Sequence, residues 1–335
     1  MKRIAIILVS EQTIPNILFL KEMEEFSIAD FYFISTKEME VSSKKKSEVI
    51  KRVGGLGNVV KVIVPADDVT AILESLDENI QIDDDACYMV NITAGTKAMA
   101  LAVYDFFRQR VSPGMVEFFY VPIGKSFMLK IFPKFGKLSV DAKLNLKEYL
   151  AAYGREIKEQ VKLSAVSVKE VKVAEDLFRD ASRRKVKSMF STNQHRVGNL
   201  LELYVACFIQ KKLNLSDDDI GIRVKISHAF TSDSSSLEYD VAYVKNNRLF
   251  LVECKCFKEA FKKSRINEEW YKLAGVKSRL GLDAVSFFVI ANKIDEQEKK
   301  KWNDYSKLFG LKGLLDIKDI QCDKFFEEFL KNILS

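Results

Sequence analysis

The 335-residue sequence has few of the residues that build zinc sites or disulfide frameworks. It contains only two histidines, His195 and His228, which excludes a histidine-rich zinc site and a two-histidine facial triad. Its five cysteines are odd in number and form no Cys-x-x-Cys pair, so we expect reduced thiols that mostly lie in hydrophobic cores. Only 5 prolines and 14 glycines interrupt the chain, and 47% of the residues are hydrophobic. This composition excludes disorder and favours about two folded domains.

Long hydrophobic runs are also lacking. Residues 4–9 form an apolar run of six after a basic start, shorter than the roughly 7–15 residues of a signal peptide, and polar residues 10–12 follow. No run approaches the roughly 20 apolar residues of a membrane span. We therefore expect a cytoplasmic protein without a membrane partner, in which residues 4–9 form a buried strand.

Positive charge is spread unevenly along the sequence. The formal net charge is +6, from 53 Lys and Arg against 47 Asp and Glu. Residues 1–154 carry 19 basic against 20 acidic residues, whereas residues 155–335 carry 34 against 27. An excess confined to the C-terminal half is expected if only that half meets a polyanion such as a nucleic acid.

Apolar strand-like runs alternate with helical segments over the first 153 residues. Near-continuous apolar strands that alternate with helices predict a parallel sheet covered on both faces, a Rossmann-like α/β domain. A small β extension and a closing helix at 146–153 complete this domain. The predicted strands are 4–9, 29–35, 59–64, 87–92, 116–121, 127–132 and 138–142, and the predicted helices are 15–26, 42–53, 67–79 and 96–110.

Residues 154–170 are polar and aperiodic, and they are predicted to form a linker between the two domains. Residues 171–335 then read as an α+β domain. Two helices, at about 170–190 and 195–213, precede three strand-like runs, and the turn at 245–248 indicates a hairpin between the last two. The predicted strands are 221–230, 238–244, 248–256 and 284–290.

The strongest chemical signal lies on this hairpin. Side chains alternate along a strand, so Glu253 and Lys255 share one face, and the preceding strand can place Asp240 opposite them. Charged groups in an otherwise apolar strand are costly without a reason. Asp240 and Glu253 suit a hard divalent cation, Mg²⁺ or Mn²⁺, assisted by the Cys254 carbonyl. Lys255 would orient or activate the attacking water, or neutralise charge on the phosphate.

Glu202 adds a carboxylate on the otherwise apolar helix 198–211, where it would support the metal or a bound water. The alternative is structural, a salt bridge of Lys255 with Glu253 or Asp240 at a sheet edge. The four residues Glu202, Asp240, Glu253 and Lys255 match the pattern of the PD-(D/E)xK nucleases, with Tyr-Asp in place of Pro-Asp.

A second signal lies between the fourth strand and the next helix of the first domain. The stretch Asn-Ile-Thr-Ala-Gly-Thr-Lys at 91–97 offers backbone N–H groups, hydroxyls and Lys97 to a phosphate on a positive helix end. Residues 10–13 follow the first strand and lie at the same carboxyl edge of the sheet. The alternative is a well-capped helix with Thr93 as its cap.

These two segments, 9–16 and 91–101, resemble the CARF (CRISPR-associated Rossmann fold) sensors. A CARF domain followed by a PD-(D/E)xK domain resembles the CRISPR ancillary nucleases that cyclic oligoadenylate activates. The resemblance implies a homodimer with one cyclic ligand across its two-fold axis. Ala94 stands where the family usually has glycine, which leaves the ring size open. By position, the ligand site would comprise Ser10, Gln12, Thr13, Asn91, Thr93, Ala94, Gly95, Thr96 and Lys97.

The expected function is a homodimeric, metal-dependent nuclease that cleaves RNA, single-stranded DNA or both and is activated by cyclic tetra-adenylate. Basic segments 179–196 and 258–279 would follow the substrate backbone, with Phe257, Phe261, Trp270 and Tyr271 as stacking partners. Alternatively, these charges cover solvated helix faces and the aromatic residues lie in the core. Two other functions stay open: a nickase of duplex DNA, and a non-catalytic regulator that binds the cyclic nucleotide.

Overall fold

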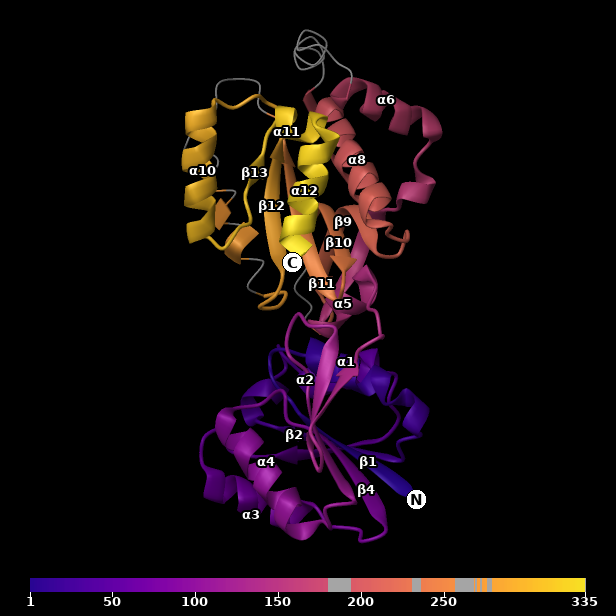
Figure 1. Cartoon of the computed structure of the whole chain (residues 1–335), viewed down its shortest axis with the longest axis vertical. Coiled ribbons are helices and arrows are strands. Elements are labelled where there is room, and N and C mark those ends of the chain that lie inside the picture. Colours follow the sequence, from indigo (N-terminus) through magenta and orange to yellow (C-terminus); the bar gives the residue numbers. More distant parts are fainter. Residues whose placement is uncertain are drawn as a thin grey trace. The chain divides into compact units, whose positions relative to one another are not determined.

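The chain forms two compact units, the first built mainly from residues 1–155 and the second mainly from residues 156–334 (Figure 1). The structure is a computed structural model that describes residues 1–179, 194–230, 236–256, 268, 270–271, 273–275 and 279–334. Each unit has its own sheet and its own hydrophobic core.

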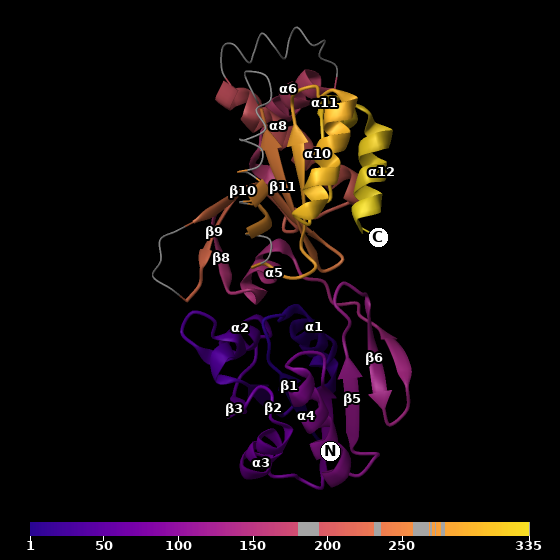
Figure 2. The ribbon, with the colours of Figure 1, turned by 90° about the vertical axis from the view of Figure 1, so that its left-hand side faces the viewer.

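The first unit is built on a seven-stranded sheet in the order β3-β2-β1-β4-β5-β6-β7 (Figure 2). Strands β1 to β5 pair in parallel, and β6 and β7 extend the sheet with antiparallel pairing. This confirms the predicted Rossmann-like class and the β extension. The strands are β1 (Lys2–Leu8), β2 (Asp30–Ser35), β3 (Val59–Ile63), β4 (Ala86–Asn91), β5 (Val116–Tyr120), β6 (Phe127–Phe132) and β7 (Gly136–Ser139).

The helices of this unit cover both faces of the sheet. Ile4, Ile6 and Leu8 of β1 join the core that is shared with α3 and α4, while the intervening Ala5 and Ile7 are also fully buried. Burial on both faces explains why the strands read as continuous apolar runs. The helices are α1 (Ile14–Glu22), α2 (Lys46–Val53), α3 (Val69–Asn79), α4 (Lys97–Arg110) and α5 (Leu146–Ala152), with 3-10 turns at Glu24–Phe26 and Lys37–Glu40.

The second unit contains a six-stranded sheet in the order β13-β12-β11-β10-β9-β8. Its strands are β8 (Arg155–Val161), β9 (Ile220–His228), β10 (Leu237–Lys245), β11 (Arg248–Lys255), β12 (Val285–Ile290) and β13 (Leu314–Leu315). The described helices are α6 (Val168–Phe178), α8 (Gln194–Leu213), α10 (Glu296–Leu308), α11 (Ile317–Gln321) and α12 (Asp323–Leu334), which with the sheet confirm the predicted α+β class.

The expectation of an aperiodic linker at 154–170 is wrong. Residues Arg155–Val161 form β8, which is the edge strand of the second sheet, and helix α6 begins at Val168. An edge strand has only one neighbour, and no residue of β8 is buried, so its polar side chains hide the apolar alternation that marks a strand.

The predicted hairpin between β10 and β11 is confirmed. Val241 pairs with Val252 and Lys245 pairs with Arg248 in an antiparallel register. The two turn residues, Asn246 and Asn247, have positive φ angles of 53° and 58°. Asparagine tolerates this left-handed conformation, which a two-residue hairpin turn of the favoured type requires.

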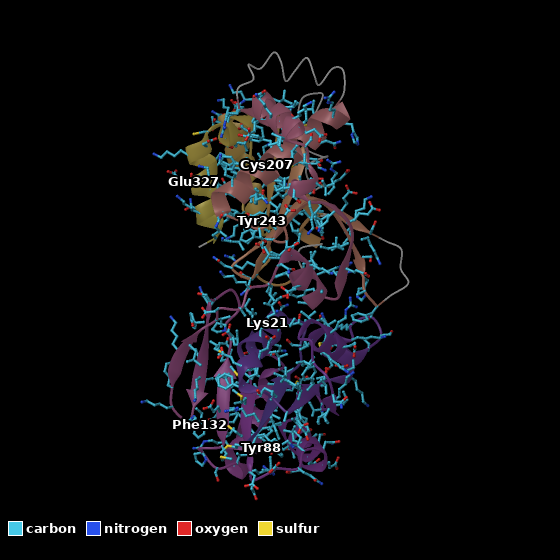
Figure 3. All side chains as sticks on the ribbon, turned by 90° about the vertical axis from the view of Figure 1, so that its right-hand side faces the viewer. Lys21, Tyr88, Phe132, Cys207, Tyr243 and Glu327 are labelled. Carbon is cyan, nitrogen blue, oxygen red and sulfur yellow. The ribbon has the colours of Figure 1, made fainter. Side chains whose placement is uncertain are left out.

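Aromatic side chains fill both cores. In the first unit Tyr88 is buried and its hydroxyl accepts a hydrogen bond of 2.7 Å from the Asp83 N–H (Figure 3). In the second unit the fully buried Tyr243 stacks on Phe250 with ring centroids 4.7 Å apart. No helix among the described residues is long and apolar enough to span a membrane.

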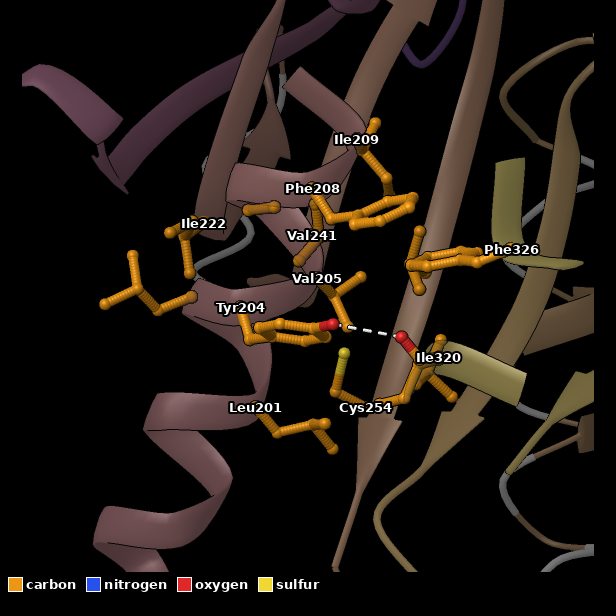
Figure 4. Close-up of a cluster of buried hydrophobic side chains, with 14 of the residues drawn as sticks. Leu201, Tyr204, Val205, Phe208, Ile209, Ile222, Val241, Cys254, Ile320 and Phe326 are labelled. Carbon is orange, nitrogen blue, oxygen red and sulfur yellow. Dashed lines mark hydrogen bonds between the residues drawn. The ribbon is translucent and has the colours of Figure 1, made fainter. Parts of the chain in front are cut away.

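Phe326 of α12 gives a direct test of the second core. Its ring is fully buried and stacks on Phe208 of α8, with centroids 4.4 Å apart (Figure 4). We expect Phe326→Ala to lower the free energy of unfolding by about 3–5 kcal/mol, measured by urea unfolding. The neighbouring Phe325 is 45% exposed, so Phe325→Ala is the matched control and should cost far less. Equal losses in the two variants would contradict this packing.

Candidate functional site

The hairpin brings three of the predicted catalytic side chains together. One step beyond the Val241–Val252 pair, the antiparallel register places Asp240 opposite Glu253. The Lys255 ammonium lies 2.5 Å from Oε1 of Glu253. Asp240 Oδ2 accepts a hydrogen bond of 2.7 Å from the Cys254 N–H, which fixes the orientation of the carboxylate.

These charges do not lie at a sheet edge, where the structural alternative placed them. The ion pair between Glu253 and Lys255 exists, but β11 lies between β10 and β12, inside the sheet. Glu253 is only 7% exposed. Desolvating a carboxylate at the end of a central strand is costly, and an isolated structural ion pair contributes little net stability to offset this cost. The position favours a functional role.

Glu202 of α8 completes a group of four residues, which we call the carboxylate–lysine cluster: Glu202, Asp240, Glu253 and Lys255. Burial raises the pKa of Glu202 to about 7, and the charges of Glu238 and Glu253 raise it further, while Arg223 and Lys255 oppose the shift. Burial also raises the pKa of Asp240 to about 6, against the influence of Lys255. The carboxylates therefore repel one another within a poorly hydrated site.

Cys254 faces the other side of the sheet. Its thiol is buried in the hydrophobic core beside Leu201 and Tyr204 of α8 (Figure 4). Burial is the largest cause that raises the pKa of this thiol well above its usual value. Only the backbone of Cys254 therefore belongs to the polar side of the site, and the side chain contributes packing.

The raised pKa of Glu202 predicts a pH dependence of stability. A carboxyl group whose pKa is raised in the folded state stabilises the fold below its unfolded pKa of 4.5, and this contribution is lost as the pH rises through about 7. Without divalent cations, we expect the unfolding free energy of the wild type, relative to Glu202→Gln, to fall by about 3 kcal/mol between about pH 4 and pH 8. Urea unfolding in a chelator measures this difference. Glu238→Gln, at an exposed carboxylate, is the control variant. If the unfolding free energy of the wild type relative to that of Glu202→Gln rises with pH, the expected sign is wrong.

In the first unit, Asn91 organises the loop between β4 and α4. This side chain is fully buried, and its amide donates to Asn16 Oδ1 at 2.9 Å, while its oxygen accepts from the Thr93 N–H at 3.1 Å and from the Thr93 hydroxyl. The Asn16 amide in turn donates to the Leu8 carbonyl at 2.8 Å. Asn16 belongs to segment 9–16, which resembles the CARF sensors, but it is not among the predicted ligand-site residues.

Thr93 is not the helix cap, as the structural alternative supposed. The N-cap of α4 is Thr96, whose hydroxyl accepts from the Met99 N–H at 3.1 Å, and the Thr93 hydroxyl instead accepts from the Val121 N–H at 2.7 Å. Gly95 between them has φ +78°, and a Cβ there would lie 3.3 Å from Leu8 and Met99 side-chain atoms. The Ala94 side chain is buried in the core, whereas Lys97 is exposed.

The segment that follows β1 is tied to the end of α5. The Gln12 N–H donates to Ser10 Oγ at 3.2 Å, and Gln12 Oε1 accepts from the Tyr153 hydroxyl at 3.0 Å. Thr13 is fully buried, and its hydroxyl donates to the Ala152 carbonyl. The polar groups of Thr13 and Asn91 thus form hydrogen bonds within the protein, so these two predicted residues hold the loops in place.

A basic group beside this segment was not among the predicted site residues. Glu11 forms ion pairs with Lys44 at 2.6 Å and with Lys46 at 3.0 Å. Both lysines follow β2, whose carboxyl end is next to that of β1 in the sheet. The run of three lysines at 44–46 is the sequence signal that marks this position.

Much of the predicted substrate path lies outside the described residues, including Phe257, Phe261 and most of the basic segments 179–196 and 258–279. Trp270 is fully buried, with Trp302 5.3 Å away between ring centroids, so it belongs to the core and is not a stacking partner. Tyr271 is 63% exposed. Within the described ranges, no three His, Cys, Asp or Glu side chains lie close enough together to hold a metal ion in their present positions.

The fold and the site define a class: an open α/β domain with polar loops at the carboxyl edge of its sheet, joined to a sheet domain that carries the carboxylate–lysine cluster. Residues 4–149 match the Card1 CARF domain, and residues 191–327 match the Card1-like endonuclease domain. The chain therefore belongs to the CARF nucleases of the Card1 type. No curated protein matches its sequence.

Two solved structures share the fold over almost the whole chain. Can2 from Sulfobacillus thermosulfidooxidans, in complex with cyclic tetra-adenylate, has 16% identity and a TM-score of 0.71, covering 99% of this chain and 97% of its own. Protein VC1899 from Vibrio cholerae has 14% identity and a TM-score of 0.75, covering 99% and 98%.

Proposed function

We propose that this protein is a metal-dependent endonuclease of CRISPR antiviral defence, activated by cyclic tetra-adenylate, which cleaves single-stranded RNA, single-stranded DNA or both. It acts in the cytoplasm as a homodimer. One observation carries the proposal: a chain with a Card1 CARF domain also holds Asp240, Glu253 and Lys255 on one face at the end of the central hairpin. The cyclic nucleotide bound to the related Can2 structure supports the choice of activator.

The donor set of the cluster fits a hard divalent cation. Asp240 and Glu253, with the Cys254 carbonyl, would hold Mg²⁺ or Mn²⁺ through oxygen. A cation would stabilise the charged carboxylates, whose pKa values are raised mainly by burial and further by neighbouring carboxylates. When bound, such a cation polarises the phosphate and lowers the pKa of a water molecule. Lys255 orients the attacking water or neutralises charge on the phosphate, and Glu202 supports the site from α8.

In the sensor, the loop at 91–97 presents backbone N–H groups at the start of α4 together with the exposed Lys97. Ser10 and Gln12 lie at the same carboxyl edge of the sheet. A two-fold dimer lets two such edges share one cyclic ligand. Binding activates cleavage only if the ligand has a higher affinity for the active state of the dimer than for the resting state.

The proposal is tested by incubating the full chain with Mn²⁺ and labelled RNA, single-stranded DNA or supercoiled plasmid, with and without each cyclic oligoadenylate. We expect cleavage of a single-stranded substrate only with cyclic tetra-adenylate. Cleavage that needs no cyclic nucleotide would disprove the switch. Nicking of plasmid alone would identify a duplex nickase, and ligand binding without any cleavage would identify a regulator.

A further inference from the structure

Arg223 of β9 has an unusual backbone conformation within the second sheet. Its φ angle is +51°, although the residues on either side, Ile222 and Val224, pair with β10 and are buried. A non-glycine residue in this region costs of the order of 1–3 kcal/mol and persists only where its surroundings hold it. The bend is tight, because a Cβ on Gly221 would come within 2.8 Å of Val224 Cγ2.

The bend has a visible consequence for the side chain. Arg223 Nε lies 3.1 Å from Oε2 of Glu202, the carboxylate that α8 contributes to the cluster. Both atoms are buried, and neither makes a regular hydrogen bond to another described residue. The Arg223 side chain is 39% exposed, whereas that of Glu202 is only 12% exposed. The Glu202 carboxylate therefore depends on Arg223 more than the reverse, because a buried charge without an opposite charge nearby is strongly unfavourable.

The position of Arg223 relates it to the rest of the cluster. The residues before and after it pair with Val241 and Tyr239, so Arg223 is the β9 residue level with Asp240. Glu202 comes from a helix, whereas Asp240 and Glu253 come from strands, and a single ion pair from β9 fixes the helical carboxylate relative to the sheet.

We propose that Arg223 is a positioning residue of the nuclease site, which acts through its ion pair to hold Glu202 in its working orientation. The inference rests on the proposed function. Partners that orient the groups of such a site typically change activity by about 10–100-fold when removed. Arg223 touches neither the strand carboxylates nor Lys255 through any contact recorded among the described residues, so its effect must pass through Glu202.

The test compares kcat and KM for a labelled single-stranded substrate, with the full chain, Mn²⁺ and saturating cyclic tetra-adenylate. Arg223→Gly is the informative variant, because glycine accepts the left-handed φ and the strand should still form. We expect kcat to fall by about 10–100-fold with little change in KM. Arg223→Lys keeps the charge and should recover part of the loss.

A double variant separates positioning from direct substrate contact. If Arg223 acts only through Glu202, adding Arg223→Gly to Glu202→Gln should change kcat by no more than about twofold. If the two substitutions lower kcat multiplicatively, or if Arg223→Gly raises KM without lowering kcat, the proposal is wrong and Arg223 contacts the phosphate backbone of the substrate.

Lys225 provides the matched control. It lies two residues further along β9 and pairs with Glu159 at 2.7 Å, with its side chain 35% exposed. Lys225→Ala should leave kcat unchanged, and an equal loss there would mean that any weakening of β9 lowers activity, which overturns the role of Arg223. Wild-type kcat in Arg223→Gly would also overturn it. A wild type that cleaves no substrate under these conditions would instead overturn the proposed function itself.

Discussion

Glu253→Gln should reduce activator-dependent cleavage by about a thousandfold or more, while cyclic tetra-adenylate still binds with wild-type affinity. The substitution keeps the size of a buried side chain that is 9% exposed, but it removes a negative charge from the centre of the carboxylate–lysine cluster. Groups that act together at a reacting phosphate make strongly non-additive contributions to the rate, so the loss of one group removes most of the rate enhancement. Single-turnover cleavage of labelled RNA and DNA measures the effect.

Lys255→Met should produce a similar loss, because it removes the ammonium group that lies 2.5 Å from Glu253 Oε1. The control is Glu238→Gln on the same face of β10, whose side chain is 45% exposed. It should retain activity. Cleavage at the wild-type rate in either Glu253→Gln or Lys255→Met would place the active site elsewhere.

Both cluster strands could be predicted from the sequence because their signals are local. Side chains alternate along a strand, so the spacing of Glu253 and Lys255 alone assigns them to one face. The two asparagines of the hairpin turn fix the register and hence the partner of Glu253, which is Asp240. Apolar runs likewise predict the parallel strands of the sensor sheet, since both faces of its central strands, such as β1, are covered.

Other features depend on contacts that spacing does not encode. Nothing in the sequence requires a left-handed backbone at Arg223, which arises from the bend after Gly221 and from pairing with Glu202. The choice between Thr93 and Thr96 as helix cap is settled by Asn91, which binds the first of them. Trp270 looks like a stacking platform in a basic segment, but packing against Trp302 buries it.

The response to cyclic tetra-adenylate should depend strongly on a single lysine, Lys97. Lys97 is the first residue of α4, is exposed, and stands directly after the Thr96 cap, where helix N–H groups point outward. A charge-assisted contact to a phosphate contributes about 1.5–3 kcal/mol. In a two-fold dimer, Lys97→Ala removes two such contacts to one ligand. We therefore expect the concentration of cyclic tetra-adenylate that gives half-maximal cleavage to rise by at least about a hundredfold.

The matched control lies at the other end of the same helix. Arg110→Ala removes an exposed basic residue that pairs with Asp77 at 2.8 Å, at the edge of the sheet opposite the loops proposed to bind the ligand, and it should leave the activation curve unchanged. At saturating activator, Lys97→Ala should still cleave at the wild-type rate, because Lys97 belongs to the first unit and the carboxylate–lysine cluster to the second. A half-maximal concentration that does not move in Lys97→Ala would remove this loop from the ligand site. A rate that falls at saturation as well would show that Lys97 also stabilises the active state of the dimer, beyond its contribution to binding.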